Sequence, residues 1–244
     1  MVALSSVAVA EGPFRQSWPL VFGLPVKYRP FPPQVVPMTR LKICGLTRPE
    51  DVDAAVHHGA DALGFVFYPP SPRALSPAQA SVLVRRIPPF IETVGLFVNE
   101  SPEVVHQTCA EVPLSLLQFH GDETPEYCRQ FNRPYLKAAR VKPGLDLLEF
   151  ALAFADARAI LLDTYVAGYG GSGKTFDWQL IPANLPVPII LSGGLDAENL
   201  EAAIRQVQPA AVDVSSGVEA SKGIKDHSKI AAFVAALRKA DERL

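Results

Sequence analysis

Four side chains that could take part in chemistry stand near the ends of short apolar runs. Cys44, His120 and Asp163 each close such a run, and Arg73 lies in a proline-rich stretch after another. A thiol and a carboxylate can act as base and acid, an imidazole can carry a proton, and a guanidinium can grip a carboxylate. These residue types indicate an acid–base site for an anionic substrate.

Each of the four has a structural alternative. Position alone leaves Cys44 either catalytic or a small core residue, which is the interpretation we adopt for Cys109 and Cys128. Asp163 could cap a helix, but the segment after it is glycine-rich and lacks a helical period. His120 fits a hydrogen-bonded positioning role better than a proton shuttle. Arg73, in a loop stiffened by prolines, suits substrate binding.

Two small-residue turns predict a phosphate site. They are Ser192-Gly193-Gly194 and Ser215-Ser216-Gly217. Glycine lets backbone N–H groups approach phosphate oxygens, and a helix N-terminus adds partial positive charge. Tight turns that need positive φ would explain the glycines, but not their occurrence after two consecutive strands. We expect Gly193, Gly194, Ser215, Ser216 and Gly217 to bind substrate.

The segment Gly168–Thr175 matches the nucleotide P-loop pattern G-x-x-x-x-G-K-[ST]. A P-loop needs a strand directly before it and a helix directly after it. Here three residues separate Thr164 from the first glycine, and the residues after Thr175 allow at most a short helical turn. We predict a lid, with Gly170, Gly171 and Gly173 as hinges and Lys174 available to an anionic ligand or a neighbouring acid.

The elements that must position these residues alternate regularly along the chain. Eight apolar runs of strand length are separated by stretches of helical period, several of which begin at capping signals. These signals are Thr47-Arg48-Pro49-Glu50, Ser76-Pro77, Ser101-Pro102-Glu103, Thr124-Pro125-Glu126 and Asp196-Ala197-Glu198. This pattern predicts a single-domain α/β (βα)₈ barrel, the TIM-barrel fold, whose active site lies at the C-terminal ends of the strands. The runs are Leu41–Cys44, Leu63–Phe67, Val94–Val98, Leu114–Phe119, Tyr135–Val141, Ile160–Leu162, Pro188–Leu191 and Ala211–Val214.

Strand alternation also predicts a buried ion pair. Lys42 lies two residues before Cys44 and so points to the same face, and Asp213 lies two residues before Ser215 on the last strand. The first and last strands are neighbours once a barrel closes. We therefore expect Lys42 and Asp213 to pair inside the barrel, in a structural role.

Composition limits the classes of function. The chain has 244 residues, a formal net charge of −2 and 48% hydrophobic residues, so it has material for one core and no charge excess for nucleic acid. No apolar run approaches the roughly 20 residues that span a bilayer. Three cysteines without paired spacing indicate neither a disulfide framework nor a zinc site, and favour the cytoplasm. We expect no cofactor and no metal; monomer and homodimer remain equally open.

The first 37 residues differ from the rest. They hold seven of the 23 prolines, show no sustained period, and end just before Met38. We interpret residues 1–37 as an extension, disordered or arising from a mis-assigned start with Met38 as the true one, and residues 38–244 as the barrel. A transit segment is the alternative.

The motifs taken together resemble the phosphoribosylanthranilate isomerase family of tryptophan biosynthesis. From Lys42 to the C-terminus they occur in order: Lys42-Ile-Cys-Gly-Leu-Thr47, Gly64-Phe-Val-Phe-Tyr-Pro69, Ser71-Pro-Arg73, Val94-Gly-Leu-Phe-Val-Asn99, Gln118-Phe-His-Gly121, Leu162-Asp-Thr164, Gly170-Gly-Ser-Gly-Lys-Thr-Phe-Asp-Trp178, Leu191-Ser-Gly-Gly194 and Val212-Asp-Val-Ser-Ser-Gly-Val-Glu219. Residues 1–37 have no counterpart in this resemblance.

The resemblance implies a cofactor-free isomerase and assigns roles. Such an enzyme converts N-(5-phosphoribosyl)anthranilate into 1-(2-carboxyphenylamino)-1-deoxyribulose 5-phosphate by an Amadori rearrangement. Asp163 would be the general acid that opens the ribose ring, and Cys44 the base that removes the C2 proton. Arg73 would hold the anthranilate carboxylate and the two glycine turns the phosphate.

Two other functions remain as alternatives. An indoleglycerol-phosphate synthase would use the same barrel and phosphate loops, but its chemistry needs lysine and glutamate where this chain offers Cys44 and Asp163. A nucleotide-binding protein would rest on Gly168–Thr175 alone. Of the partners considered, a small phosphorylated substrate is expected, and nucleic acid and membrane are not.

Overall fold

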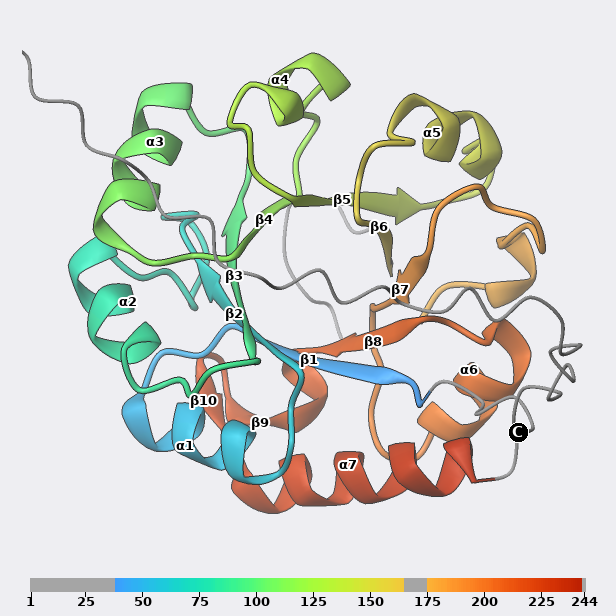
Figure 1. The fold of residues 1–244 in the computed structure, drawn as a ribbon. Coiled ribbons are helices and arrows are strands. Elements are labelled where there is room, and N and C mark those ends of the chain that lie inside the picture. The colour runs from blue at the N-terminus through green and yellow to red at the C-terminus, as the bar shows by residue number, and fades with distance from the viewer. Residues whose placement is uncertain (1–37, 165–174, 243–244) are drawn as a thin grey trace, which may run out of the picture. The chain divides into compact units, whose positions relative to one another are not determined.

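Eight parallel strands form a closed barrel in the computed structural model, which describes residues 38–164 and 175–242. Each strand pairs with the next in the sequence, and β8 pairs with β1 to close the sheet (Figure 1). The predicted (βα)₈ architecture is confirmed. The strands are β1 (Arg40–Cys44), β2 (Ala62–Val66), β3 (Glu92–Phe97), β4 (Leu116–Phe119), β5 (Tyr135–Val141), β6 (Ala159–Thr164), β7 (Ile189–Leu191) and β8 (Ala211–Val214).

Helices surround the barrel and cover the outer face of the sheet (Figure 1). Within the described residues, the connection from β6 to β7 has only the 3₁₀ turn η1 (Trp178–Leu180), in agreement with the short helical turn expected there. The α-helices are α1 (Pro49–His57), α2 (Pro77–Val84), α3 (Pro102–Glu111), α4 (Pro125–Arg129), α5 (Leu147–Ala153), α6 (Leu200–Val207) and α7 (His227–Asp241).

Most of the predicted helix starts are capped as expected. Ser76, Ser101 and Thr124 each accept a hydrogen bond from a first-turn N–H, with proline at the first helical position. Two starts differ. The residue before α1 is Arg48, whose side chain has only donors and so cannot cap the helix. The Thr47 hydroxyl donates to Gly223 O and does not cap α1 either.

The start predicted at Asp196-Ala197-Glu198 was wrong. α6 begins at Leu200, four residues after Asp196. The Asp196 carboxylate accepts hydrogen bonds from the N–H groups of Glu198 and Asn199, which holds this segment in a turn before the helix. These bonds have the pattern of a capping side chain, and the Leu200 N–H donates to Asp196 O, so Asp196 caps a separate turn that leads into α6.

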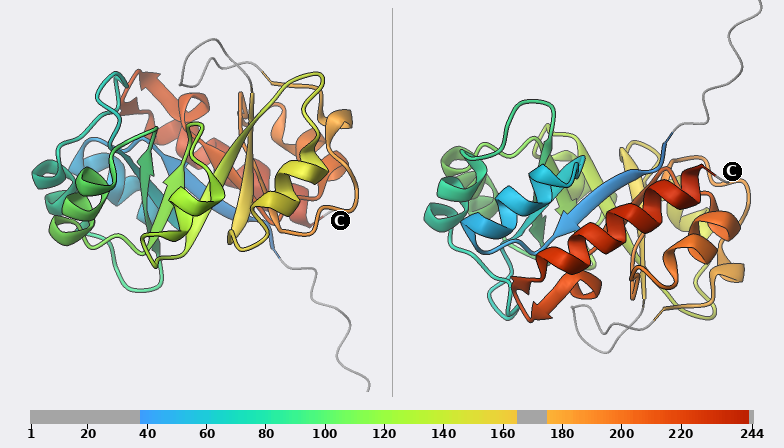
Figure 2. Two further views of the ribbon diagram at one scale, coloured as in Figure 1. Left: turned by 90° about the horizontal axis from the view of Figure 1, so that it is seen from above. Right: turned by 90° about the horizontal axis from the view of Figure 1, so that it is seen from below.

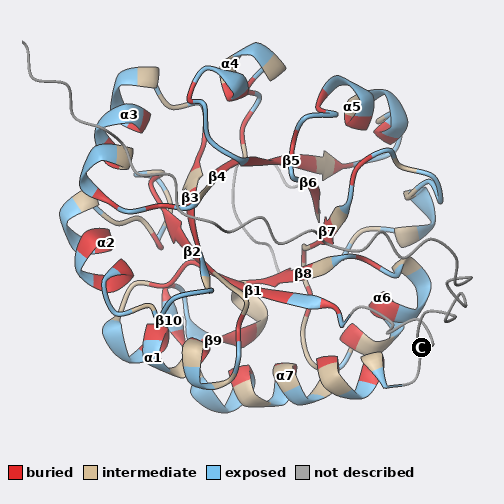
Figure 3. Ribbon diagram, in the orientation of Figure 1, coloured by how far each residue is buried: buried red, intermediate tan, exposed pale blue. Residues whose placement is uncertain are grey.

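Two apolar cores hold the barrel together. The larger lies between the strands and the helices, so the inner faces of the helices are buried and their outer faces exposed (Figure 3). The smaller fills the barrel interior with Val94, Leu136, Ala138, Ala159, Leu161 and Ile190. On the outside, α7 packs beside α1 and α6 (Figure 2). This packing fixes the strand ends, and hence the side chains that follow them.

The β1–β8 seam contains the predicted ion pair. Lys42 is the register partner of Asp213, and their side chains form a salt bridge in the interior. After β8 the chain forms the 3₁₀ turn η2 (Ser216–Val218) and an antiparallel hairpin of β9 (Glu219–Ser221) and β10 (Ile224–Lys225) before α7. That hairpin was not predicted.

No helix in the described part of the chain is long and apolar enough to cross a membrane. The predicted extension, residues 1–37, and the predicted lid residues Gly170, Gly171, Gly173 and Lys174 lie outside the described residues.

Candidate active site

One cavity at the C-terminal ends of the strands collects most of the predicted site residues. Its lining includes Cys44, Arg73, His120, Asp163, Gly193, Gly194, Ser215 and Ser216. These residues come from the ends of β1, β4, β6, β7 and β8 and from the loop after β2. The fold therefore brings distant parts of the sequence into one pocket.

Cys44 ends β1 and is 5% exposed. Burial raises the pKa of its thiol, and the nearby Lys42 ammonium opposes that rise. The thiol is thus mostly protonated at neutral pH, but the thiolate that does form is a strong base. Cys109 and Cys128 are also free thiols; burial raises the pKa of Cys128 to about 12, which makes it inert.

Asp163 lies at the end of β6 in a short chain of hydrogen bonds. Its Oδ1 accepts from the Thr164 N–H at 2.8 Å, and its Oδ2 lies 3.1 Å from His120 Nε2. Gln118 Nε2 lies 3.0 Å from His120 Nδ1 and donates to it, which leaves the ring proton on Nε2, facing Asp163. His120 is therefore positioned from both sides.

Gln118 was not among the predicted site residues. Its side chain lines the cavity and is fully buried, and its Oε1 has no hydrogen-bond partner in the described part of the structure. A signal existed in the sequence, because Gln118 lies two residues before His120 and so points to the same face of the sheet.

The two glycine turns present free backbone donors to the cavity. Within the described residues, the N–H groups of Gly193, Gly194 and Ser216 donate no hydrogen bond. Ser216 is also the first residue of η2, so its N–H points along the start of a helical turn. This arrangement can bind an anion such as phosphate.

Two of these glycines are required by close approach. Gly193 has φ +83°, and a Cβ there would lie 2.9 Å from Asp163 Oδ1 and closer still to Thr164. Gly217 does not line the cavity; a Cβ there would lie 2.0 Å from the Leu195 carbonyl oxygen. Gly217 therefore lets the β7 and β8 loops pack against each other.

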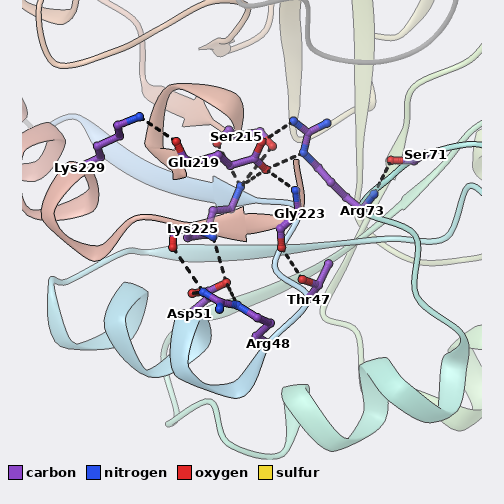
Figure 4. Close-up of polar contacts among 10 residues, drawn as sticks. All are labelled: Thr47, Arg48, Asp51, Ser71, Arg73, Ser215, Glu219, Gly223, Lys225 and Lys229. Carbon is purple, nitrogen blue, oxygen red and sulfur yellow. Dashed lines mark hydrogen bonds and ion pairs between the residues drawn. The ribbon is translucent and has the colours of Figure 1, made fainter. Parts of the chain in front are cut away.

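Arg73 is bonded differently from the free guanidinium that the sequence suggested. Its Nε and Nη2 donate to the two carboxylate oxygens of Glu219, each at 2.7 Å (Figure 4). Lys225 Nζ donates to the same carboxylate and to Ser215. Neither Glu219 nor Lys225 was predicted as a site residue, since both lie in a short polar segment that has no distinctive pattern.

The P-loop interpretation gains no support from the described residues. After Thr175 the chain forms coil and then the 3₁₀ turn η1, whereas a P-loop needs an α-helix at that point. Among the same residues there is no cluster of three or more histidine, cysteine or acidic side chains that could hold a metal ion.

Comparison with known proteins places these features in one family. The family model described as N-(5'-phosphoribosyl)anthranilate (PRA) isomerase matches residues 41–236. The N-(5'-phosphoribosyl)anthranilate isomerase of Dechloromonas aromatica is 69% identical over 206 residues, which are 84% of this chain and 99% of that protein. The Thermotoga maritima phosphoribosyl anthranilate isomerase structure has a TM-score of 0.77 and 47% identity, and covers 83% of this chain and 100% of that one.

A second crystal structure of a phosphoribosyl anthranilate isomerase contains reduced 1-(o-carboxyphenylamino)-1-deoxyribulose 5-phosphate. It matches with a TM-score of 0.74 and 44% identity, covering 83% of this chain and 100% of that one.

Proposed function

The chain belongs to the N-(5'-phosphoribosyl)anthranilate isomerase family, and we propose that Cys44 and Asp163 supply the base and the acid of its reaction. The protein is an isomerase of tryptophan biosynthesis. It converts N-(5-phosphoribosyl)anthranilate into 1-(2-carboxyphenylamino)-1-deoxyribulose 5-phosphate. The reaction needs two proton transfers, and two groups of different acidity can each carry out one of them.

The first step is ring opening. Protonated Asp163 gives its proton to the ribose ring oxygen while the anilino nitrogen lone pair forms a C=N bond to C1 and the C1–O bond breaks. The product is an open-chain Schiff base, and Asp163 becomes a carboxylate. His120, whose Nε2 lies 3.1 Å from Asp163 Oδ2, holds that carboxyl group in place and donates to it in its ionised form.

Gln118 can serve both states of this acid. When Asp163 is ionised, the Gln118 amide N–H donates to His120 Nδ1 and the ring proton stays on Nε2. When Asp163 carries the proton, it can donate to Nε2, and a half-turn of the amide presents the Gln118 Oε1 acceptor to an Nδ1–H group. A glutamine can therefore support either histidine tautomer.

The second step is removal of the C2 proton. The Cys44 thiolate takes this proton, and the electrons of the C–H bond form the C1=C2 double bond of an enolamine while the C=N electrons return to nitrogen. Tautomerisation of the enolamine to the aminoketone completes the rearrangement. Burial strengthens the thiolate as a base, and Lys42 keeps that anion accessible.

The ends of the substrate bind in separate regions. The free N–H groups of Gly193, Gly194 and Ser216 suit the phosphate, and Ser215 and Gly217 complete that loop pair. Arg73, on the loop after β2, suits the anthranilate carboxylate. Lys174 remains a proposed lid residue for the anionic substrate.

The observation that carries this proposal is that Cys44, Asp163, Arg73 and the two glycine turns line one cavity. The test uses freshly prepared N-(5-phosphoribosyl)anthranilate deuterated at C2 and follows the loss of anthranilate fluorescence. Wild type should turn over, with slower turnover of the deuterated substrate. Cys44→Ala should abolish the reaction while leaving substrate binding intact; unchanged turnover in this variant would refute the role of the thiol.

The nucleotide alternative is tested by calorimetry. ATP with magnesium should give no heat at concentrations where reduced 1-(o-carboxyphenylamino)-1-deoxyribulose 5-phosphate gives a clear signal. Micromolar ATP binding that disappears in Lys174→Ala would restore the P-loop interpretation.

The setting of the enzyme also remains a proposal. We expect it to act in the cytoplasm, where its three free cysteines stay reduced, as a monomer or a homodimer. We expect residues 1–37 to be an extension of the catalytic barrel with no part in the chemistry.

A further inference from the structure

One edge of the Arg73 guanidinium group is hydrogen-bonded within the protein. Nε and Nη2 donate to Glu219 Oε1 and Oε2, each at 2.7 Å, and the side chains of Arg73 and Glu219 are 8% and 5% exposed. A guanidinium has five N–H donors. Within the described residues, Nη1 forms no hydrogen bond. A substrate carboxylate must therefore meet the Nη1 end of the group, whose direction Glu219 sets (Figure 4).

Glu219 is itself held by a second buried cation. Lys225 Nζ lies 3.0 Å from Glu219 Oε1, 3.0 Å from Ser215 O and 3.3 Å from Ser215 Oγ, and its side chain is completely buried. The Gly223 N–H adds a hydrogen bond to Glu219 Oε1 at 3.3 Å. The carboxylate of Glu219, on β9, thus has partners from the loop after β2, from β10 and from the turn between β9 and β10.

The hairpin is tied to the first strand–helix unit. The Lys225 N–H donates to Asp51 Oδ2 on α1 at 3.1 Å, and Thr47 donates to the Gly223 carbonyl. Asp51 also binds Arg48 (Figure 4). Because both ends of the cluster are fixed, Arg73 cannot turn without breaking its bonds to Glu219.

The cluster lacks one counter-ion. Arg73 and Lys225 bring two positive charges and Glu219 one negative charge, which leaves a net charge of +1 beside the cavity. Burial would raise the pKa of Glu219, but Arg73 and Lys225 more than offset burial and lower it, so Glu219 stays ionised. A buried net charge is unfavourable until an anion neutralises it.

We propose that Glu219, fixed by Lys225, is a positioning residue that orients Arg73 toward the substrate carboxylate, while Lys225 restores the positive charge that Glu219 neutralises. This inference rests on the proposed carboxylate-binding role of Arg73. It makes the Arg73–Glu219–Lys225 cluster a determinant of specificity for substrates that carry the ortho carboxyl group.

Loss of Glu219 should weaken carboxylate binding even though it removes a negative charge. Burial lowers the pKa of Lys225, and Glu219 is the main group that opposes this effect. Without Glu219, Lys225 loses its proton more readily, so the charge of the cluster increases little. The remaining effect is the lost orientation of Arg73. Nε and Nη2 of Arg73 donate to different carboxylate oxygens of Glu219, and glutamine replaces one of these oxygens with an NH₂ group that can only donate.

The test compares two stable ligands by calorimetry. One is reduced 1-(o-carboxyphenylamino)-1-deoxyribulose 5-phosphate, and the other is the same compound without the carboxyl group. Wild type should bind the first more tightly by on the order of 10- to 100-fold. In Glu219→Gln this ratio of Kd values should fall by about tenfold, with little change for the ligand without the carboxyl group.

Three further variants make the test specific. Lys225→Met leaves the cluster neutral and should also reduce the ratio, and it serves as the second variant if Glu219→Gln does not fold. In an Arg73→Ala background, Glu219→Gln should change the ratio no further. Glu123→Gln is the matched control, because Glu123 pairs with Lys137 at 2.8 Å with both side chains 2% exposed; it should lower stability without changing the ratio.

The outcomes separate the two proposals. If wild type binds both ligands equally, the carboxylate role of Arg73 fails, and this inference with it. If wild type discriminates through Arg73 but Glu219→Gln and Lys225→Met keep the full ratio, only the positioning role is overturned. If Glu219→Gln loses affinity equally for both ligands, Glu219 has a merely structural role, and the positioning role is overturned as well.

Discussion

Lys42 Nζ lies 2.8 Å from Asp213 Oδ1, inside the barrel where β1 meets β8. Burial would lower the pKa of Lys42, but Asp213 and Cys44 offset burial and raise it, so the ammonium stays charged. The same ammonium opposes the rise in the pKa of Cys44, two residues farther along β1. The Lys42–Asp213 ion pair therefore lies at the seam that closes the barrel and also influences the pKa of the Cys44 thiol.

Lys42→Met should destabilise the protein by about 3–5 kcal/mol, because it leaves the Asp213 carboxylate buried without its partner. Urea unfolding measures this change. Arg86→Met removes the exposed Arg86–Asp53 pair and should cost at most about 1 kcal/mol. Equal effects of the two variants would contradict a special role for the buried pair.

Chemical modification of Cys44 should become faster as pH rises. Alkylation needs the thiolate, and burial raises the pKa of the Cys44 thiol, so the reactive form increases with pH. We expect the rate of alkylation of Cys44 by iodoacetamide to climb between about pH 7 and pH 10, and the rise to begin at higher pH in Lys42→Met, which lacks the opposing charge. Mass spectrometry measures this rate, which reports the thiol alone, whereas kcat/KM also depends on the proton of Asp163. A rate that does not change with pH in wild type would contradict a raised pKa for this thiol.

Cys44→Ser should lower kcat strongly and change KM little, since a hydroxyl is a much weaker proton acceptor than a thiolate at neutral pH. Steady-state kinetics with fresh substrate measures both constants. Cys109→Ser on α3, away from the cavity lining, is the control and should retain activity. Near wild-type kcat in Cys44→Ser would return Cys44 to a packing role.

Asp163→Asn should reduce kcat by roughly 10²–10⁴-fold with substrate still bound, because the amide keeps the shape of the carboxyl group but cannot deliver its proton. Asp156→Asn, which alters a carboxylate paired with Arg129 on the surface, is the matched control. If both variants keep full activity, another group must protonate the ring oxygen.

Acid should weaken the fold through Asp51. Burial would raise the pKa of this carboxyl group, but hydrogen bonds from Arg48, the Lys225 N–H and His227 more than offset burial and lower it. Because the pKa is lower in the folded state than the usual value of about 3.9, the ionised group stabilises the fold above that pH, and this contribution disappears as pH falls through the folded-state pKa.

Urea unfolding from about pH 6 down to about pH 2 should therefore show a falling free energy of unfolding in wild type and a smaller fall in Asp51→Asn. Asp53→Asn, at an exposed pair, should change the pH dependence much less. Identical curves for wild type and Asp51→Asn would exclude Asp51 as a source of acid sensitivity.

The sequence by itself determined the barrel fold and the position of the site at the C-terminal ends of the strands. Eight apolar runs with helical stretches between them specify parallel strands, and the parallel arrangement gathers Cys44 and Asp163 at one rim. The Lys42–Asp213 pair was also predictable. The two-residue period of a strand points both side chains into the barrel, and closure of the barrel makes their strands neighbours. These are consequences of local periodicity and topology.

Only the tertiary structure decided how Arg73 is held. Its partner Glu219 is 146 residues away in the sequence, and Lys225 reaches the same carboxylate from a hairpin of very short strands. Charged residues in short polar segments usually face solvent, so no local pattern distinguishes these two. Their burial follows from the packing of the hairpin against α1 and the first loops, and that packing exists only after β8 has closed on β1.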